Sequence, residues 1–261
     1  MRTANPTLSD NVFLNEVKSS GSVDSQKMTI QGTVNKSIFL ISLLVISAGF
    51  VAITLLATAT TDPTSGLLIL NSSLAFPLMM VGSIGGLIAV IVASFKKTLS
   101  PVIAPVYAIL EGLFIGAISV FMETIYPGIV LQASMITFGI FFGLLGAYKS
   151  GMIKATENFK MGVAAATMGI MLAYVANFVM GFFGASIPMI HESGLMGIGF
   201  SLFVVVIASL NLVLDFDFIE SGEAAGAPKY MEWYASIGLL VTLVWLYVEV
   251  LRLLAKLQSR D

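Results

Sequence analysis

Residues 195–254 decide the fold and read LMGIGFSLFVVVIASLNLVLDFDFIESGEAAGAPKYMEWYASIGLLVTLVWLYVEVLRLL. They contain two apolar segments, 195–219 and 233–254, which are joined by a short polar connection. Each segment is long enough for an α-helix to cross a bilayer, because about 20 residues span ~30 Å of hydrocarbon. We therefore expect two membrane-spanning helices in this stretch.

Five further apolar segments of similar length precede these two. They lie at residues 37–58, 74–95, 102–122, 128–148 and 159–183. Hydrophobic residues make up 57% of the chain and charged residues only 11%. Soluble domains usually carry about 25% charged residues. The sequence thus predicts an all-α, polytopic membrane protein with a seven-transmembrane-helix bundle.

Composition argues against several other functions. The net charge of -2 gives no basic field, so a nucleic-acid partner is not expected. The chain has no cysteine, which excludes disulfides, thiolate metal sites and a cysteine nucleophile. It also lacks the GxSxG, HExxH and GxxxxGK[ST] patterns. We therefore expect neither an enzyme nor a cofactor.

Charge outside the apolar segments predicts the domain organisation and the orientation. Residues 1–36 are polar and lack a helical apolar period, which predicts a mobile cytosolic tail before a membrane domain at 37–261. Lys and Arg occur in this tail and in every second connection, so the positive-inside rule predicts a cytosolic N-terminus in the plasma membrane. Arg252, Lys256 and Arg260 follow the seventh segment. Either this basic end is exported or the seventh segment is re-entrant.

Glycine pairs four residues apart mark expected helix contacts. Small residues let helix backbones approach closely in a membrane, where lipid offers no hydrophobic driving force. The pairs are Gly82 with Gly86, Gly112 with Gly116, and Gly139 with Gly143. We expect packing seams within the bundle, with contacts between subunits as the alternative. The oligomeric state stays open.

Four acidic residues lie within the apolar segments or at their ends. They are Glu111, Asp215, Asp217 and Glu249. A charged side chain at the bilayer centre costs roughly 2.5 to 3.5 kcal/mol on insertion scales, so each carboxyl must be protonated, hydrated or bound to a cation. A cation or proton site is therefore the first functional hypothesis.

Depth and helical phase assign Glu111 and Asp215 to an ion pathway or pH sensor. Glu111 lies about ten residues into its segment, near the bilayer centre at ~1.5 Å per residue, and one turn from Tyr107. The alternative for Glu111 is a protonated carboxyl bonded to a neighbouring helix. Asp215 lies one turn from Asn211, which predicts a polar strip that faces the interior.

The other two acids receive different assignments. Asp217 is rotated by ~200° from Asp215, so the two cannot face one ligand on a regular helix. We expect Asp217, together with Glu220, at a hydrated rim. Glu249 lies three residues before Arg252, which predicts an ion pair on one helical face at the opposite membrane interface.

Two motifs resemble the bacterial branch of the Bax inhibitor-1 family. They are residues 210–254, LNLVLDFDFIESGEAAGAPKYMEWYASIGLLVTLVWLYVEVLRLL, and residues 111–119, EGLFIGAIS. The resemblance implies a bundle whose last helix is central, wrapped by the other six, and a pH-sensitive calcium leak through its interior. In the family, one aspartate on the sixth helix and one on the seventh close the pore. Asp215 matches the sixth-helix aspartate, and Glu111 matches an early acidic residue.

The chain departs from this pattern on the seventh helix. Aligning LYVEVLRLL with the family's closing segment places Thr242 near the second aspartate, and the family's early basic partner has no counterpart. Two close carboxyls share a proton, so the loss of one removes that switch. Asp215 can still titrate through burial alone. Alternatively, Asp217 or Glu232 serves as the second carboxyl if the helix end unwinds.

Two functions from different classes remain. The first is a calcium or cation leak whose path is lined by Glu111, Asp215, Asn211 and Thr242. Calcium takes about six to eight oxygen ligands, and no EF-hand spacing is present, so any metal site at Glu111 and Asp215 is expected to be weak. The second is a membrane regulator that binds a membrane protease or a stress-response protein.

Overall fold

The computed structural model describes residues 27–61, 63, 68–185, 187, 190 and 192–259. Seven long helices make up most of this part of the chain, and each is long and apolar enough to span a membrane. They are α2 (Ile30–Ala57), α3 (Ser72–Phe95), α4 (Ser100–Ile125), α5 (Ile129–Lys149), α6 (Glu157–Gly181), α8 (Leu195–Ala224) and α9 (Met231–Gln258). The predicted all-α bundle of seven membrane-spanning helices is confirmed.

Short elements complete two of the connections. The 3-10 helix η1 (Lys97–Leu99) lies between α3 and α4. Strands β1 (Thr60–Thr61) and β2 (Leu68–Ile69) pair antiparallel between α2 and α3. Strands of two residues are too short to show an alternating pattern, so the sequence did not predict this hairpin.

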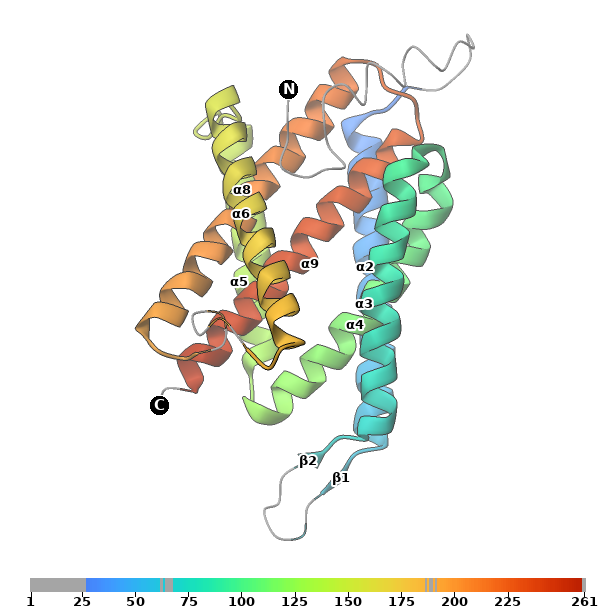
Figure 1. Cartoon of the computed structure of the whole chain (residues 1–261). Coiled ribbons are helices and arrows are strands. Elements are labelled where there is room, and N and C mark those ends of the chain that lie inside the picture. The colour runs from blue at the N-terminus through green and yellow to red at the C-terminus, as the bar shows by residue number, and fades with distance from the viewer. Residues whose placement is uncertain are drawn as a thin grey trace.

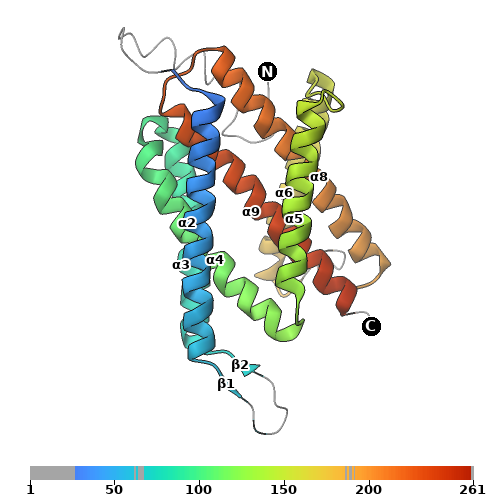
Figure 2. The same cartoon turned by 180° about the vertical axis from the view of Figure 1, so that it is seen from behind.

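Helix α9 runs diagonally through the centre of the bundle (Figure 1). Helices α2, α3 and α4 lie on one side of it and α5, α6 and α8 on the other, as the view from behind also shows (Figure 2). α9 packs closely against α2, α4, α5 and α8, whereas α3 packs mainly on α4 and α6 mainly on α8. The last helix is therefore central, but four helices rather than six form its close wrap.

Apolar clusters fill both sides of α9. On one side, Leu243 belongs to a cluster with Leu212 of α8. On the other side, Leu240 belongs to a cluster with Leu40 of α2. Lipid is as apolar as these side chains, so the clusters stabilise the bundle by close packing rather than by removal from water. The outer faces expose large apolar side chains such as Phe95, as contact with lipid requires.

Two of the three predicted glycine seams lie between helices. A Cβ added at Gly82 of α3 would lie 2.6 Å from the Phe114 backbone nitrogen in α4, and one added at Gly116 of α4 would lie 2.6 Å from the Ala48 carbonyl oxygen in α2. The third pair is a correction. A Cβ at Gly139 or Gly143 of α5 meets no atom within 4 Å among the described residues, so this pair forms no seam inside the chain.

Helix α2 begins earlier than predicted. Residues 30–36, expected in the tail, form its first turns because the Thr29 side chain accepts a hydrogen bond from the Gly32 amide at 2.9 Å. Just before the helix, the Met28 amide donates to the Ala227 carbonyl at 2.6 Å, and the Met28 side chain is buried. The chain entering α2 is thus fixed to the α8–α9 connection, while residues 1–26 of the predicted tail lie outside the described residues.

The seventh span is one unbroken helix rather than a re-entrant segment. α9 contains 28 residues, which extend about 42 Å at ~1.5 Å per residue. α2 begins at one end of the bundle and α9 ends at the other (Figure 1). We call these ends the N-side and the C-side. Arg252 and Lys256 of α9 therefore lie toward the C-side, and Arg260 lies outside the described residues.

Candidate functional site

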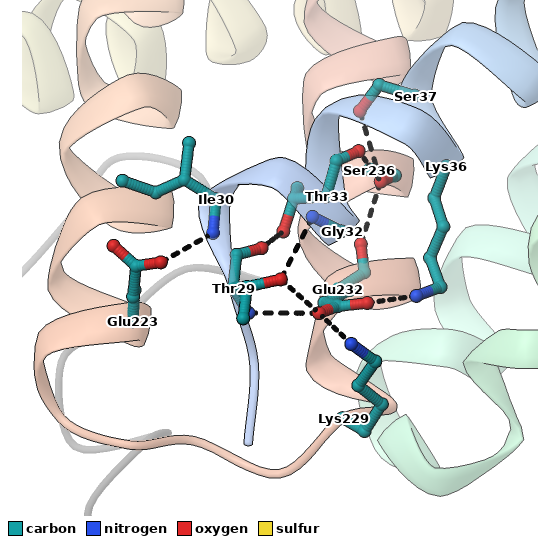
Figure 3. A network of polar contacts seen from close by, with 10 residues as sticks. All are labelled: Thr29, Ile30, Gly32, Thr33, Lys36, Ser37, Glu223, Lys229, Glu232 and Ser236. Carbon is teal, nitrogen blue, oxygen red and sulfur yellow. Dashed lines mark hydrogen bonds and ion pairs between the residues drawn. The ribbon is translucent and has the colours of Figure 1, made fainter. Parts of the chain in front are cut away.

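Glu232, in the first turn of α9, has a fully buried side chain whose two oxygens are both bound (Figure 3). Lys36 of α2 contacts Oε2, and Lys229 lies 2.9 Å from Oε1. The Thr29 amide and hydroxyl donate to Oε1 at 2.9 and 3.0 Å. Two cations and two hydrogen-bond donors therefore compensate the burial of this carboxylate.

The surroundings of Glu232 join three parts of the chain (Figure 3). The Ile30 amide at the start of α2 donates to Glu223 at the end of α8 at 2.9 Å. Ser37 of α2 and Ser236 of α9 are hydrogen-bonded at 3.1 Å. A Cβ at Gly32 would overlap the Glu232 carboxylate, so only glycine allows this close approach. The network ties α2, α8 and α9 together at the N-side.

The structure does not bring Glu232 to Asp215 as the second carboxyl that the sequence suggested for an unwound helix end. α8 is continuous from Leu195 to Ala224, so the helix does not unwind near Asp215. Glu232 is engaged by Lys36 and Lys229 instead.

Asp215 is the least compensated buried carboxyl among the described residues. It lies in the α8 interior with 2% exposure, and its Oδ2 has no hydrogen-bond partner there. The Thr242 hydroxyl of α9 interacts with the same carboxyl. The structure thus brings together Asp215 and the residue that stands near the family's second aspartate.

Two polar contacts connect α8 to α6 on either side of Asp215 along the chain. The Asn211 Nδ2 atom donates to the Thr167 hydroxyl at 2.8 Å and to the Ile207 carbonyl at 2.8 Å. Lys160 Nζ lies 2.6 Å from Asp217 Oδ2. Asp217 is therefore an ion-pair partner of a buried lysine and not simply a hydrated rim.

Another ion pair lies toward the C-side. Arg252 Nη1 lies 3.1 Å from Glu249 Oε1, the contact that the spacing of three residues predicts. The Tyr174 hydroxyl of α6 donates to Glu249 at 3.0 Å and accepts from Arg252 at 2.6 Å. Lys256 Nζ donates to the Gly197 carbonyl of α8 at 3.0 Å. Helices α6, α8 and α9 are therefore linked by charged groups at this end as well.

Glu111 lies apart from these groups. It is half-buried in α4 and interacts with the Tyr107 hydroxyl. A Cβ at Gly86 of α3 would lie 2.5 Å from its Oε1 atom, so the carboxyl rests on α3. α4 and α8 occupy opposite sides of α9 (Figure 1). Glu111 contacts Tyr107 and α3, whereas Asp215 contacts Thr242 of α9, so their described contacts have no residue in common.

No preformed metal cage joins these carboxyls. Among the described residues, no group of three or more His, Cys, Asp or Glu side chains is placed to hold a metal ion. The chemistry that the arrangement offers is instead a single carboxylate with hydroxyl and amide oxygens nearby. Such a set binds a cation weakly compared with a calcium site of several carboxylates.

The contribution of α6 was not predicted from the sequence. Its residues Lys160, Thr167 and Tyr174 recur every seven positions in a largely apolar helix, and each holds a polar partner on α8 or α9. This period was visible in the sequence. The partners could not be read from the sequence, because they are distant along the chain. Thr167 is 44 residues from Asn211, and Tyr174 is 78 residues from Arg252.

The chain matches a known protein family. A family profile described as Bax inhibitor 1 like matches residues 5–259, nearly the whole chain. No curated protein matches the chain.

Proposed function

This chain belongs to the Bax inhibitor 1-like family, and we propose that it is a pH-sensitive cation leak or transporter with calcium as the permeant ion. We propose the cell membrane as its location, with a cytosolic N-terminus. The distribution of Lys and Arg among the connections supports this orientation. The single observation that carries the proposal of conduction is the buried, incompletely bonded carboxyl of Asp215.

The carboxyl of Asp215 is costly to bury. A buried polar atom without a partner is unfavourable, and an ionisable residue in a membrane span is rarely kept without a role. A proton or a passing cation would satisfy the Oδ2 atom of Asp215. Conduction needs a site that binds strongly enough to admit an ion and weakly enough to release it. A single carboxylate beside Thr242 meets that requirement better than a dense cage does.

The same carboxyl supplies the proposed pH dependence. A neutral carboxylic acid does not attract a cation, whereas its ionised form does. Calcium flux is therefore expected to fall as acidification protonates Asp215. In the family's acid pair two carboxyls share one proton, but Thr242 cannot ionise, so we expect a single titration step in the flux profile.

Liposome flux tests the proposal. Purified protein is reconstituted with a calcium-sensitive dye inside the vesicles, and Asp215→Asn is expected to reduce the initial calcium flux about tenfold, which corresponds to ~1.4 kcal/mol. Glu157→Gln, an exposed carboxyl in the first turn of α6, is the matched control. Glu111→Gln measures whether the second candidate contributes. Unchanged flux in Asp215→Asn would overturn the proposal.

The regulatory alternative has one observation in its favour. The glycines of α5, including Gly139 and Gly143, face open space among the described residues, and small residues are typical of surfaces where membrane helices meet. A membrane protease or stress-response protein would be such a partner. If wild-type protein passes no calcium, while a crosslinker placed at Gly143 captures one dominant membrane protein, the alternative replaces the leak.

A further inference from the structure

Polar side chains of α6 form a ladder along the α6–α8–α9 seam. Lys160, Thr167 and Tyr174 are separated by seven residues each, which brings them to within ~20° of one helical face. At ~1.5 Å per residue the ladder is about 21 Å long, against ~30 Å of hydrocarbon. It therefore covers most of the thickness of a bilayer.

Each rung of the ladder bonds across the seam. Lys160 pairs with Asp217 of α8, Thr167 accepts from Asn211 of α8, and Tyr174 bonds Glu249 of α9. Asp215 lies along α8 between the first two contacts. Polar contacts between α6 and α8 therefore lie before and after the incompletely bonded carboxyl along α8.

Apolar side chains separate the rungs. Val163 lies between the first two, and Ile170, which packs with Val204 and Ile207 of α8, lies between the second and the third. Short hydrophobic constrictions of this kind close pores by excluding water. The seam as the structure presents it is therefore closed to a hydrated ion.

Each end of the seam holds a cation that belongs to the protein. At the N-side, the Lys160 side chain is 4% exposed and binds Asp217. At the C-side, Arg252 binds Glu249, which is 2% exposed. These tethered cations occupy the carboxylates that a mobile cation would otherwise meet on entry. A lysine that simply avoided the membrane would extend its amine into water, as lysines near helix ends commonly do.

We propose that the α6–α8–α9 seam is the ion route, and that Lys160 and Arg252 close its two ends by holding Asp217 and Glu249 as built-in counter-ions. The inference rests on the proposed cation leak and specifies its path and its closure. Opening requires a mobile cation to displace a tethered one. Glu111, on the other side of α9, is not part of this route.

Opposite effects of two neighbouring substitutions test the inference. Lys160→Met removes the tethered cation and leaves Asp217 to a mobile ion. Calcium flux into liposomes should therefore rise about fivefold. This ratio corresponds to ~1 kcal/mol, the upper end of the range for ion pairs that are partly exposed. Asp217→Asn keeps the lysine amine at the entrance without its partner, so flux should fall. Lys154→Met, an exposed lysine in the α5–α6 connection, is the control and should leave flux unchanged.

The outcomes separate the inference from the proposed function. If both single variants change flux in the same direction, the ion pair is only structural and the inference is wrong, whereas a loss of flux in Asp215→Asn would still support the leak. If neither the wild type nor Lys160→Met passes calcium, the leak itself is refuted. Elution of each variant as a monodisperse peak in detergent ensures that flux is compared between folded proteins.

Discussion

Glu232 and Asp215 are both buried carboxyls in the central helices, yet their environments differ completely. Glu232 is bound by two lysines, a backbone amide and a hydroxyl. Asp215 interacts with one hydroxyl, and its Oδ2 atom has no partner among the described residues. The two acids thus share burial and differ in the number of groups that satisfy the carboxyl, and our proposal that Asp215 acts in ion passage rests on that difference.

Their positions support the same distinction. Glu232 lies where the start of α2, the end of α8 and the start of α9 meet, so its bonds fix the geometry of three segments (Figure 3). Asp215 lies within α8 and interacts with Thr242 of α9. We expect substitutions at Glu232 to change stability and substitutions at Asp215 to change ion passage.

The largest expected effect on stability comes from Glu232→Gln. Removing one partner of a fully buried ion pair costs about 3 to 5 kcal/mol, but Lys229 and Lys36 partly reach solvent, so we expect a loss of about 2 kcal/mol. Chemical unfolding in detergent measures it. An unfolding midpoint equal to that of the wild type would show that Glu232 does not stabilise the fold.

A smaller loss is expected from Gly32→Ala. Its Cβ would overlap the Glu232 carboxylate, which is the end of a flexible side chain, so we expect a loss of about 1 kcal/mol, the lower end of the range for overpacking. Gly139→Ala is the matched control, because its Cβ meets no described atom within 4 Å. There the higher helix propensity of alanine should stabilise α5 by up to about 1 kcal/mol. Opposite shifts of the unfolding midpoint are the predicted result, and equal shifts would show that the contact with Glu232 is not tight.

The smallest effect is expected from Thr242→Val, which tests whether the Thr242 hydroxyl contributes to ion passage at Asp215. The substitution removes the hydroxyl beside the carboxyl while nearly keeping the side-chain volume. A single hydrogen bond contributes roughly 0.5 to 1.5 kcal/mol, so calcium flux should change by about threefold. Flux measured over a range of pH is the readout. A change confined to the unfolding midpoint would assign Thr242 to packing alone.

The fold could be predicted because its signals are local. Apolar length defined the seven spans, and three-residue and four-residue spacings placed Arg252 near Glu249 and Asn211 on the face of Asp215. The central position of α9 followed from the family resemblance rather than from any local pattern.

The rest of the site depends on distant parts of the chain. Lys36 and Glu232 are separated by 196 residues, and no local spacing links them. Glu111 and Asp215 are both carboxyls within apolar segments, but sequence alone could not show that α9 separates their helices. The ladder on α6 could have been predicted, because Lys160, Thr167 and Tyr174 repeat every seven residues in a largely apolar helix.

Calcium flux and unfolding of Asp215→Asn and Glu232→Gln, measured on the same preparations, test the central claim most directly. We predict that Asp215→Asn loses about tenfold in flux and keeps or gains stability, because a buried neutral amide costs less than an incompletely paired carboxylate. Glu232→Gln should lose stability and keep its flux per folded molecule. The reverse pattern, with flux lost at Glu232 and retained at Asp215, would contradict the account.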